Sequence, residues 1–113
     1  MPYLHLRTSK TLTDEENTRL KSRFGQAITC LPGKTERWLM VDLEGGAVLT
    51  LGGEMRPLAM VEVALFGKAP ATAYETLTAE ICRVLAEELG LPGDGVYVKY
   101  EEVQHWGYDG GNF

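Results

Sequence analysis

The sequence predicts an α/β (α+β) fold: a duplicated β-α-β unit that forms a four-stranded mixed sheet with two helices on one face. Three observations predict it. Apolar residues mark four short strand-like segments, they recur at helical spacing in two longer segments, and Leu-Pro-Gly follows both helical segments, at 31–33 and 91–93. The 113 residues fit a single domain over 1–113, with pseudo-repeats of about 1–56 and 57–113.

The first unit begins with a strand over residues 1–8, where apolar side chains alternate with polar ones. Thr13 and Glu16 have the spacing of a capping box, so a helix is expected to begin directly after Thr13. The helix should end at 31–33, because proline and glycine both oppose a helical backbone there.

Two further elements are expected in the first unit. The apolar run Trp38 to Val41 predicts a buried strand. Residues 47–51 lie between two glycine pairs, a pattern that suits a short hairpin arm. Both segments therefore continue the sheet in this interpretation.

The second unit repeats the order of the first. Residues 58–66 predict a strand, and Thr72 with Glu75 has the spacing of a second capping box. Apolar residues at helical spacing follow, and Gly90 is expected to end that helix in a left-handed conformation. The last predicted strand covers residues 96–100.

The predicted sheet has features that favour association. Two β-α-β units can share one sheet with both helices on the same side, which leaves the other face and two edges uncovered. Aliphatic side chains from Leu58 to Leu65 are expected on the uncovered face, so we expect a homo-oligomer. The aromatic residues Trp106, Tyr108 and Phe113 follow the last strand and are expected to pack on a neighbouring surface.

Composition excludes several classes of partner. Eleven Lys and Arg against sixteen Asp and Glu give a net charge of −5, which opposes binding to nucleic acid or to an anionic membrane. The apolar runs are too short to span a bilayer. No secretory signal is recognisable, so the expected location is the cytoplasm, or the outside of the cell by a non-classical route.

Common catalytic motifs are missing from the sequence. There is no Gly-x-Ser-x-Gly motif for a serine nucleophile. His5 and His105 lie a hundred residues apart without metal-ligand spacing, and Cys30 and Cys82 lack a Cys-x-x-Cys partner. We therefore expect no metal and no cofactor.

Pro2 is the remaining candidate for chemistry. If Met1 is removed, the ring nitrogen of Pro2 becomes a secondary amine and can act as a base. An α-amino group titrates near about 8, and desolvation beside cations lowers that pKa toward neutrality. The alternative is purely structural, because proline is tolerated at the start of a strand.

Short motifs along the whole chain resemble those of one family. In order they are Met1-Pro2, Pro32-Gly33-Lys34, Leu51-Gly52-Gly53, Phe66-Gly67-Lys68, Val96-Tyr97-Val98, Trp106-Gly107-Tyr108 and Asn112-Phe113. In this order and at this length they resemble the macrophage migration inhibitory factor family of the tautomerase superfamily. The resemblance implies a homotrimer with active sites between subunits.

The resemblance also implies roles for individual residues. Pro2 would be the catalytic base, Lys34 would hold the acidic end of the substrate, and the backbone amide of Phe66 would donate a hydrogen bond to it. Tyr97 of a neighbouring subunit would line the pocket. Lys99 departs from the family, because the vertebrate cytokines carry a substrate-binding asparagine there.

Lys99 and Trp38 each have two open interpretations. Lys99 lies two residues from Tyr97, so both side chains share a strand face and can enter one pocket. The alternative for Lys99 is a solvated lysine at the strand edge. Trp38 and Trp106 stand where the family places residues of the pocket rim, and core packing is the alternative for Trp38.

Two function classes follow from these residues. The first is a keto–enol tautomerase, of the phenylpyruvate tautomerase or dopachrome isomerase type, that acts on a small keto or enol carboxylate without a cofactor. The alternative is a secreted cytokine mimic of the same family that acts by binding a host receptor, with vestigial catalysis. Hydration or dehalogenation of an unsaturated acid would need further arginine or acidic groups near Pro2, and the sequence shows no clear set.

Overall fold

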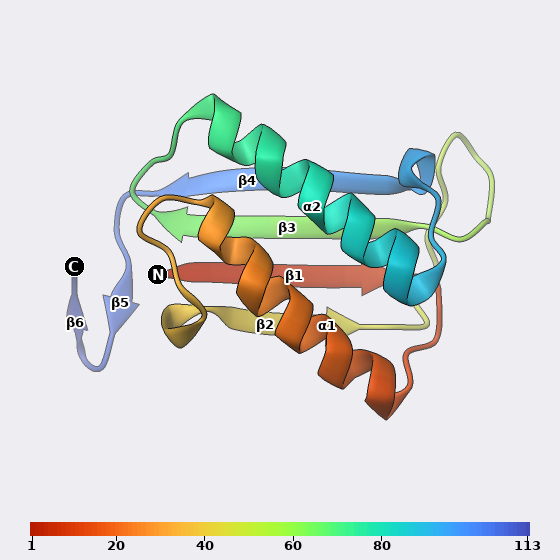
Figure 1. Cartoon of the computed structure of the whole chain (residues 1–113), viewed down its shortest axis with the longest axis horizontal. Helices are drawn as coiled ribbons and strands as arrows, with labels where there is room; N and C mark the ends of the chain where they lie inside the picture. Colours follow the sequence, from red (N-terminus) through yellow and green to blue (C-terminus); the bar gives the residue numbers. More distant parts are fainter.

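Four strands form one mixed sheet in the order β2-β1-β3-β4 (Figure 1). A computed structural model describes all 113 residues and gives the strands as β1 (Pro2–Thr8), β2 (Met40–Glu44), β3 (Ala59–Phe66) and β4 (Val96–Val103). The pairs β1/β2 and β3/β4 are parallel, while β1 and β3 pair antiparallel in the middle. The predicted fold of two joined β-α-β units is confirmed.

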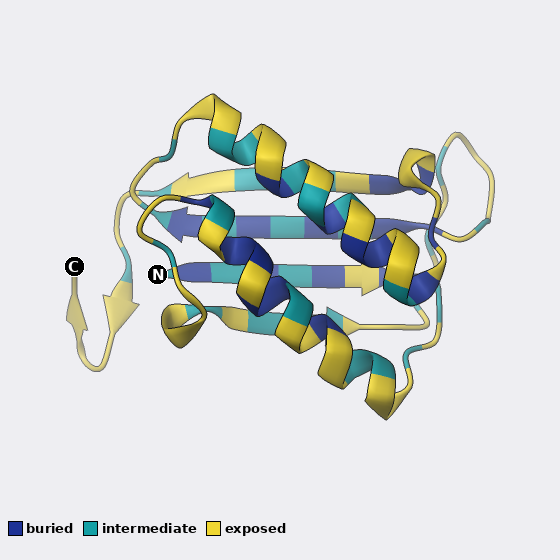
Figure 2. Cartoon of the chain, in the orientation of Figure 1, coloured by how far each residue is buried: buried dark blue, intermediate teal, exposed yellow.

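Both helices lie across the same face of the sheet (Figure 1). They are α1 (Asp14–Ala27) and α2 (Ala71–Leu89), and their buried side chains face the strands (Figure 2). Eighteen buried apolar residues form the core between the two layers. Neither helix combines the length and the apolar character needed to cross a membrane.

The two helix starts differ from each other. At α1 the predicted capping box is present: the Glu16 amide donates to the Thr13 hydroxyl oxygen at 3.1 Å, and the Thr13 amide donates to the Glu16 carboxylate at 3.0 Å. The capping box expected at Thr72 is wrong, because α2 already begins at Ala71 after Pro70 and has no side-chain cap. The proline carbonyl accepts the first helical hydrogen bonds instead.

The strand predicted over Trp38 to Val41 is present, but it starts two residues later than predicted and is not buried. Trp38 closes a short 3-10 turn, Glu36–Trp38, and β2 starts only at Met40. This turn lies against α1 at Gly25, where an added Cβ would come within 2.2 Å of the Glu36 carboxylate. Glu36 makes this contact with the helix, while Trp38 at the end of the turn stays 41% exposed.

The hairpin arm expected at 47–51 reduces to one bridge, Leu51 with Glu54. A different hairpin closes the chain: β5 (Gly107–Tyr108) and β6 (Gly111–Asn112) pair beyond the sheet (Figure 1). Asp109 and Gly110 both have positive φ, as a two-residue type I′ turn requires. This Asp-Gly signal was available in the sequence.

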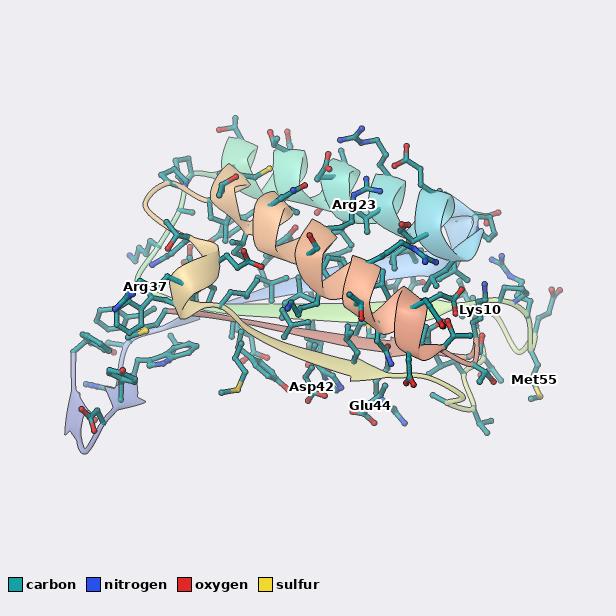
Figure 3. The ribbon with its side chains drawn as sticks, turned by 60° about the horizontal axis from the view of Figure 1, so that its bottom comes forward. Lys10, Arg23, Arg37, Asp42, Glu44 and Met55 are labelled. Atoms are coloured by element: carbon teal, nitrogen blue, oxygen red, sulfur yellow. The ribbon has the colours of Figure 1, made fainter.

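The uncovered face of the sheet carries a charged cluster at its centre, which corrects the expectation of an aliphatic face. The apolar residues of β3 point to the helices, since Ala59, Val61, Val63 and Leu65 are buried. The alternate residues face the open side, where His5 stands between Asp42 on β2 and Glu62 on β3. Figure 3 shows Asp42 and Glu44 on the side of the sheet away from the helices. Association through this face would bring together charged groups and the exposed side chains of Met40 and Tyr97.

The two helix starts provide a matched pair of substitutions. We expect Thr13→Ala to destabilise the fold by about 1 kcal/mol, because it removes the capping hydrogen bond. For a chain of this length that lowers Tm by about 4 °C. Thr72→Ala should leave Tm nearly unchanged, since the Thr72 side chain caps nothing. Thermal unfolding of both variants at one protein concentration is the measurement, and equal losses would contradict the assignment.

Candidate functional site

Pro2 is the first residue of an interior strand, and its side chain is buried. It stands opposite Leu65 on β3, so the start of the chain meets the end of β3. Met1 continues this pairing: its carbonyl oxygen accepts a hydrogen bond from the Phe66 amide at 3.0 Å. The Phe66 amide therefore points at the position that precedes Pro2.

Lys34 reaches the same place from the turn after α1. Gly33 enables that turn with a φ of +76°, and the Lys34 Nζ donates to the Phe66 carbonyl at 2.9 Å. Burial lowers the pKa of the Met1 α-amine from its usual value of 8.0, and the charge and hydrogen bond of Lys34 lower it further. The structure thus brings the start of the chain, Lys34 and Phe66 together.

A cavity of about 590 Å³ opens beside Pro2, large enough for a small organic acid. Its walls are mostly apolar and include Trp38, Trp106 and Tyr108. No carboxylate lines it, and its one charged side chain is the cation of Arg37. Arg37 was not among the site residues predicted from the sequence, although it directly precedes Trp38.

Aromatic rings connect this cavity to the C-terminal hairpin. Trp38 meets the edge of Tyr108 at 5.3 Å between ring centroids, and Tyr108 stacks on Phe113 at 6.2 Å. Phe113 lies 5.7 Å from Phe66. Tyr108 and Phe113 therefore have aromatic partners within their own chain, yet both stay more than half exposed. Their packing on a neighbouring surface stays a prediction. Trp38 lies at the rim of the cavity and not in the core.

Tyr97 and Lys99 lie elsewhere in the chain. Both face the open side of β4, and Tyr97 stands beside Met60, toward the end of the sheet away from Pro2. Lys99 Nζ lies 3.2 Å from Glu62 and 3.6 Å from Glu101, and these carboxylates raise its pKa. Within one chain neither side chain joins Pro2, so their role in a neighbouring subunit's pocket stays a prediction.

One group of metal-type ligands is present: His5, Asp42 and Glu44 lie within 4.8 Å of one another. Metal-ligand spacing in the sequence does not reveal this group, because strand pairing brings together residues 37 and 39 positions apart. The three residues already have protein partners. The Tyr3 hydroxyl donates to Asp42 at 2.7 Å, and His5 hydrogen-bonds to Glu44. The group is therefore explained as a hydrogen-bonded network on the open face.

Comparison with known proteins points to one family over the whole chain. The family model described as macrophage migration inhibitory factor (MIF) matches residues 1–113. A macrophage migration inhibitory factor homolog of Trichuris trichiura is 26% identical over 83 residues, covering 72% of this chain and 73% of that protein. The macrophage migration inhibitory factor of Xenopus laevis is 22% identical and covers 100% of this chain and 99% of its own length.

Solved structures agree with this. The crystal structure of Leishmania major MIF2 has a TM-score of 0.93 at 27% identity, with 100% of this chain and 97% of that chain covered. The macrophage migration inhibitory factor homologue from Prochlorococcus marinus has a TM-score of 0.84 at 25% identity, with 98% of each chain covered. The structure of Pt0534 inactivated by 2-oxo-3-pentynoate shares the fold, with a TM-score of 0.84 at 21% identity over 96% of this chain and 93% of its own.

The contact between Lys34 and the start of the chain makes a prediction about the α-amine. In the chain that begins with Met1, Lys34→Met should raise the amine pKa toward 8.0, because a nearby positive charge no longer opposes protonation. The pKa should stay below 8.0, since burial is the larger cause. The pH dependence of α-amine acetylation, followed by mass spectrometry, measures it. Lys21→Met, on the exposed side of α1, is the control, and equal values in both variants would refute the contact.

Proposed function

The chain belongs to the macrophage migration inhibitory factor family, and from that premise we propose a keto–enol tautomerase in which the Pro2 amine is the general base. Membership supports a tautomerase or MIF-like role. The proposal that Pro2 is the base rests on the contacts of Met1, the residue before it. Its carbonyl accepts from the Phe66 amide, and its amine lies against Lys34.

Met1 occupies the position that this proposal gives to the substrate. Its removal frees one N–H donor at Phe66 and leaves the Lys34 cation beside the vacated space. It also converts the Pro2 nitrogen from an amide into a secondary amine at the cavity wall. A base, a cation and a hydrogen-bond donor then converge on one volume next to an apolar pocket. These are the groups that proton transfer on a carboxylate substrate needs.

The chemistry of the base follows from its surroundings. Burial and Lys34 lower the pKa of the α-amine at Met1. We propose that the same two influences act on the Pro2 nitrogen once Met1 is removed and that nitrogen becomes an amine. A lowered pKa increases the unprotonated fraction of the amine at any given pH. Pro2 can then accept a proton without a histidine.

The proposed substrate is an α-keto acid of the phenylpyruvate type. The Pro2 nitrogen takes a proton from the carbon next to the ketone, and the electron pair moves to the ketone oxygen as an enolate. The protonated amine returns the proton to that oxygen and gives the enol. Lys34 and the Phe66 amide hold the acidic end, while Trp38 and Trp106 surround the aromatic ring.

Oligomerisation completes the proposal. Proteins of this family are typically oligomeric, and we propose a homotrimer in which Tyr97 and Lys99 of one subunit reach the Pro2 pocket of the next. The exposed positions of both side chains on the open face of β4 are compatible with contact between subunits. The receptor-binding alternative stays a prediction from the resemblance.

The first test addresses the base. Pro2→Gly and Pro2→Ala should each lower phenylpyruvate ketonisation by roughly 100-fold or more, because a more freely rotating primary amine replaces the ring nitrogen that the strand holds in place. A variant that retains an extension before Pro2 should be inactive too, since the nitrogen stays an amide. Intact mass identifies which form carries the activity. Near wild-type turnover by the glycine variant would exclude this mechanism.

The second test addresses the shared site. Pro2→Gly subunits and Tyr97→Ala/Lys99→Asn subunits should each be nearly inactive alone. Unfolded together in equal amounts and refolded, they should recover up to about a quarter of wild-type activity, because random assembly gives some sites both intact halves. Recovery no greater than the mean of the two separately refolded variants would show that the site does not cross a subunit boundary. Light scattering reports the mass of the assembly.

A further inference from the structure

We infer that Arg37 makes this pocket selective for keto acids that carry a second carboxylate at the end away from the reacting carbon. The inference rests on the proposed function for its reaction and on the geometry of Arg37 for its selectivity. Arg37 lines the cavity that contains Pro2, and it is the one charged side chain in that wall. Figure 3 shows Arg37 beside the aromatic rings near the C-terminal hairpin.

Arg37 has no acidic partner in the chain. Every other arginine lies within 4.0 Å of a carboxylate, namely Arg7, Arg19, Arg23, Arg56 and Arg83. No such pair exists for Arg37, although the chain carries sixteen acidic residues against eleven Lys and Arg. Its charge is therefore available to a ligand.

The guanidinium is nevertheless held in place. Its carbon lies 5.1 Å from the centroid of the Trp38 ring, and Trp38 in turn packs against the edge of Tyr108. This contact is a cation–π interaction. It leaves hydrogen-bond donors of the guanidinium unpaired, and such donors can grip a carboxylate with two parallel bonds.

Lys34 and Arg37 lie three residues apart in the chain, but their side chains contact different groups. We expect them to bind opposite ends of a ligand. The Lys34 side chain contacts Met1 and the Phe66 carbonyl. The Arg37 side chain lies over the Trp38 ring, on the aromatic side of the cavity. Lys34 contacts Met1, and Met1 lines the cavity. A ligand that takes the place of Met1 with its α-carboxylate at Lys34 can therefore extend its far end into the cavity, toward the aromatic rings. A second carboxylate there meets Arg37, while a plain phenyl ring meets only apolar walls.

The test uses two substrates that differ by one carboxylate: phenylpyruvate and 4-carboxyphenylpyruvate. The wild type should prefer the dicarboxylate by roughly three- to tenfold in kcat/KM, mainly through KM, as expected for a charged contact at an exposed site. Arg37→Gln should abolish the preference, and Arg37→Lys should keep part of it, since lysine retains the charge without the fork. Arg83→Gln, which removes an exposed arginine on α2, is the matched control and should keep the wild-type preference.

A binding measurement separates this inference from the proposed function. Calorimetric titration with cinnamate and 4-carboxycinnamate needs no turnover. The wild type should bind 4-carboxycinnamate more tightly than cinnamate, whereas Arg37→Gln should bind the two with equal affinity. If neither keto acid reacts but this discrimination holds, the tautomerase proposal fails and the selectivity stands. If the preference in kcat/KM and in binding is unchanged in Arg37→Gln, the inference is overturned. An equal loss for both substrates also overturns it, because Arg37 would then hold the shared carboxylate.

Discussion

The antiparallel pairing of β1 with β3 is the constraint on which the candidate site depends. It sets Pro2 opposite Leu65, so the first residues of the chain lie beside Phe66 at the end of β3. Because β2 runs parallel to β1, helix α1 must carry the chain back to that same end before β2 begins. The turn after α1 therefore delivers Lys34 to the N-terminus.

Charge is distributed unevenly around this junction. The chain has a net charge of −5, yet the wall of the cavity beside Pro2 contains no carboxylate. Acidic residues gather on the open face of the sheet, where Glu62 pairs with Lys99 and Glu44 with His5 and Arg7. The cations near Pro2 contact a backbone carbonyl or an aromatic ring instead. A protein that is acidic overall can thus present a cationic pocket to an anionic substrate.

Local patterns predicted the elements best where neighbouring residues decide them. The capping box at Thr13 is present because both of its hydrogen bonds form within one turn. The same pattern failed at Thr72, since Pro70 starts that helix earlier. The strand was predicted to begin at Trp38, but a turn forms there instead. That turn packs against Gly25 on α1, and such a contact between separate elements is not visible in a local pattern. Alternation in β3 was visible in the sequence, but which set faces the helices was assigned wrongly.

By itself the sequence determined the two β-α-β units, the helical crossovers and Pro2 with Lys34 as candidates, because these rest on short-range periodicity, on turn residues and on family motifs. The family motifs also placed Phe66 with them, but only the tertiary structure decided which atoms meet and which further residues join. The Phe66 amide at the Met1 carbonyl, Arg37 beside Pro2 and His5 beside Asp42 are contacts between different elements. Strand register and the packing of loops set such contacts, and an alternation of period two is equally compatible with several registers.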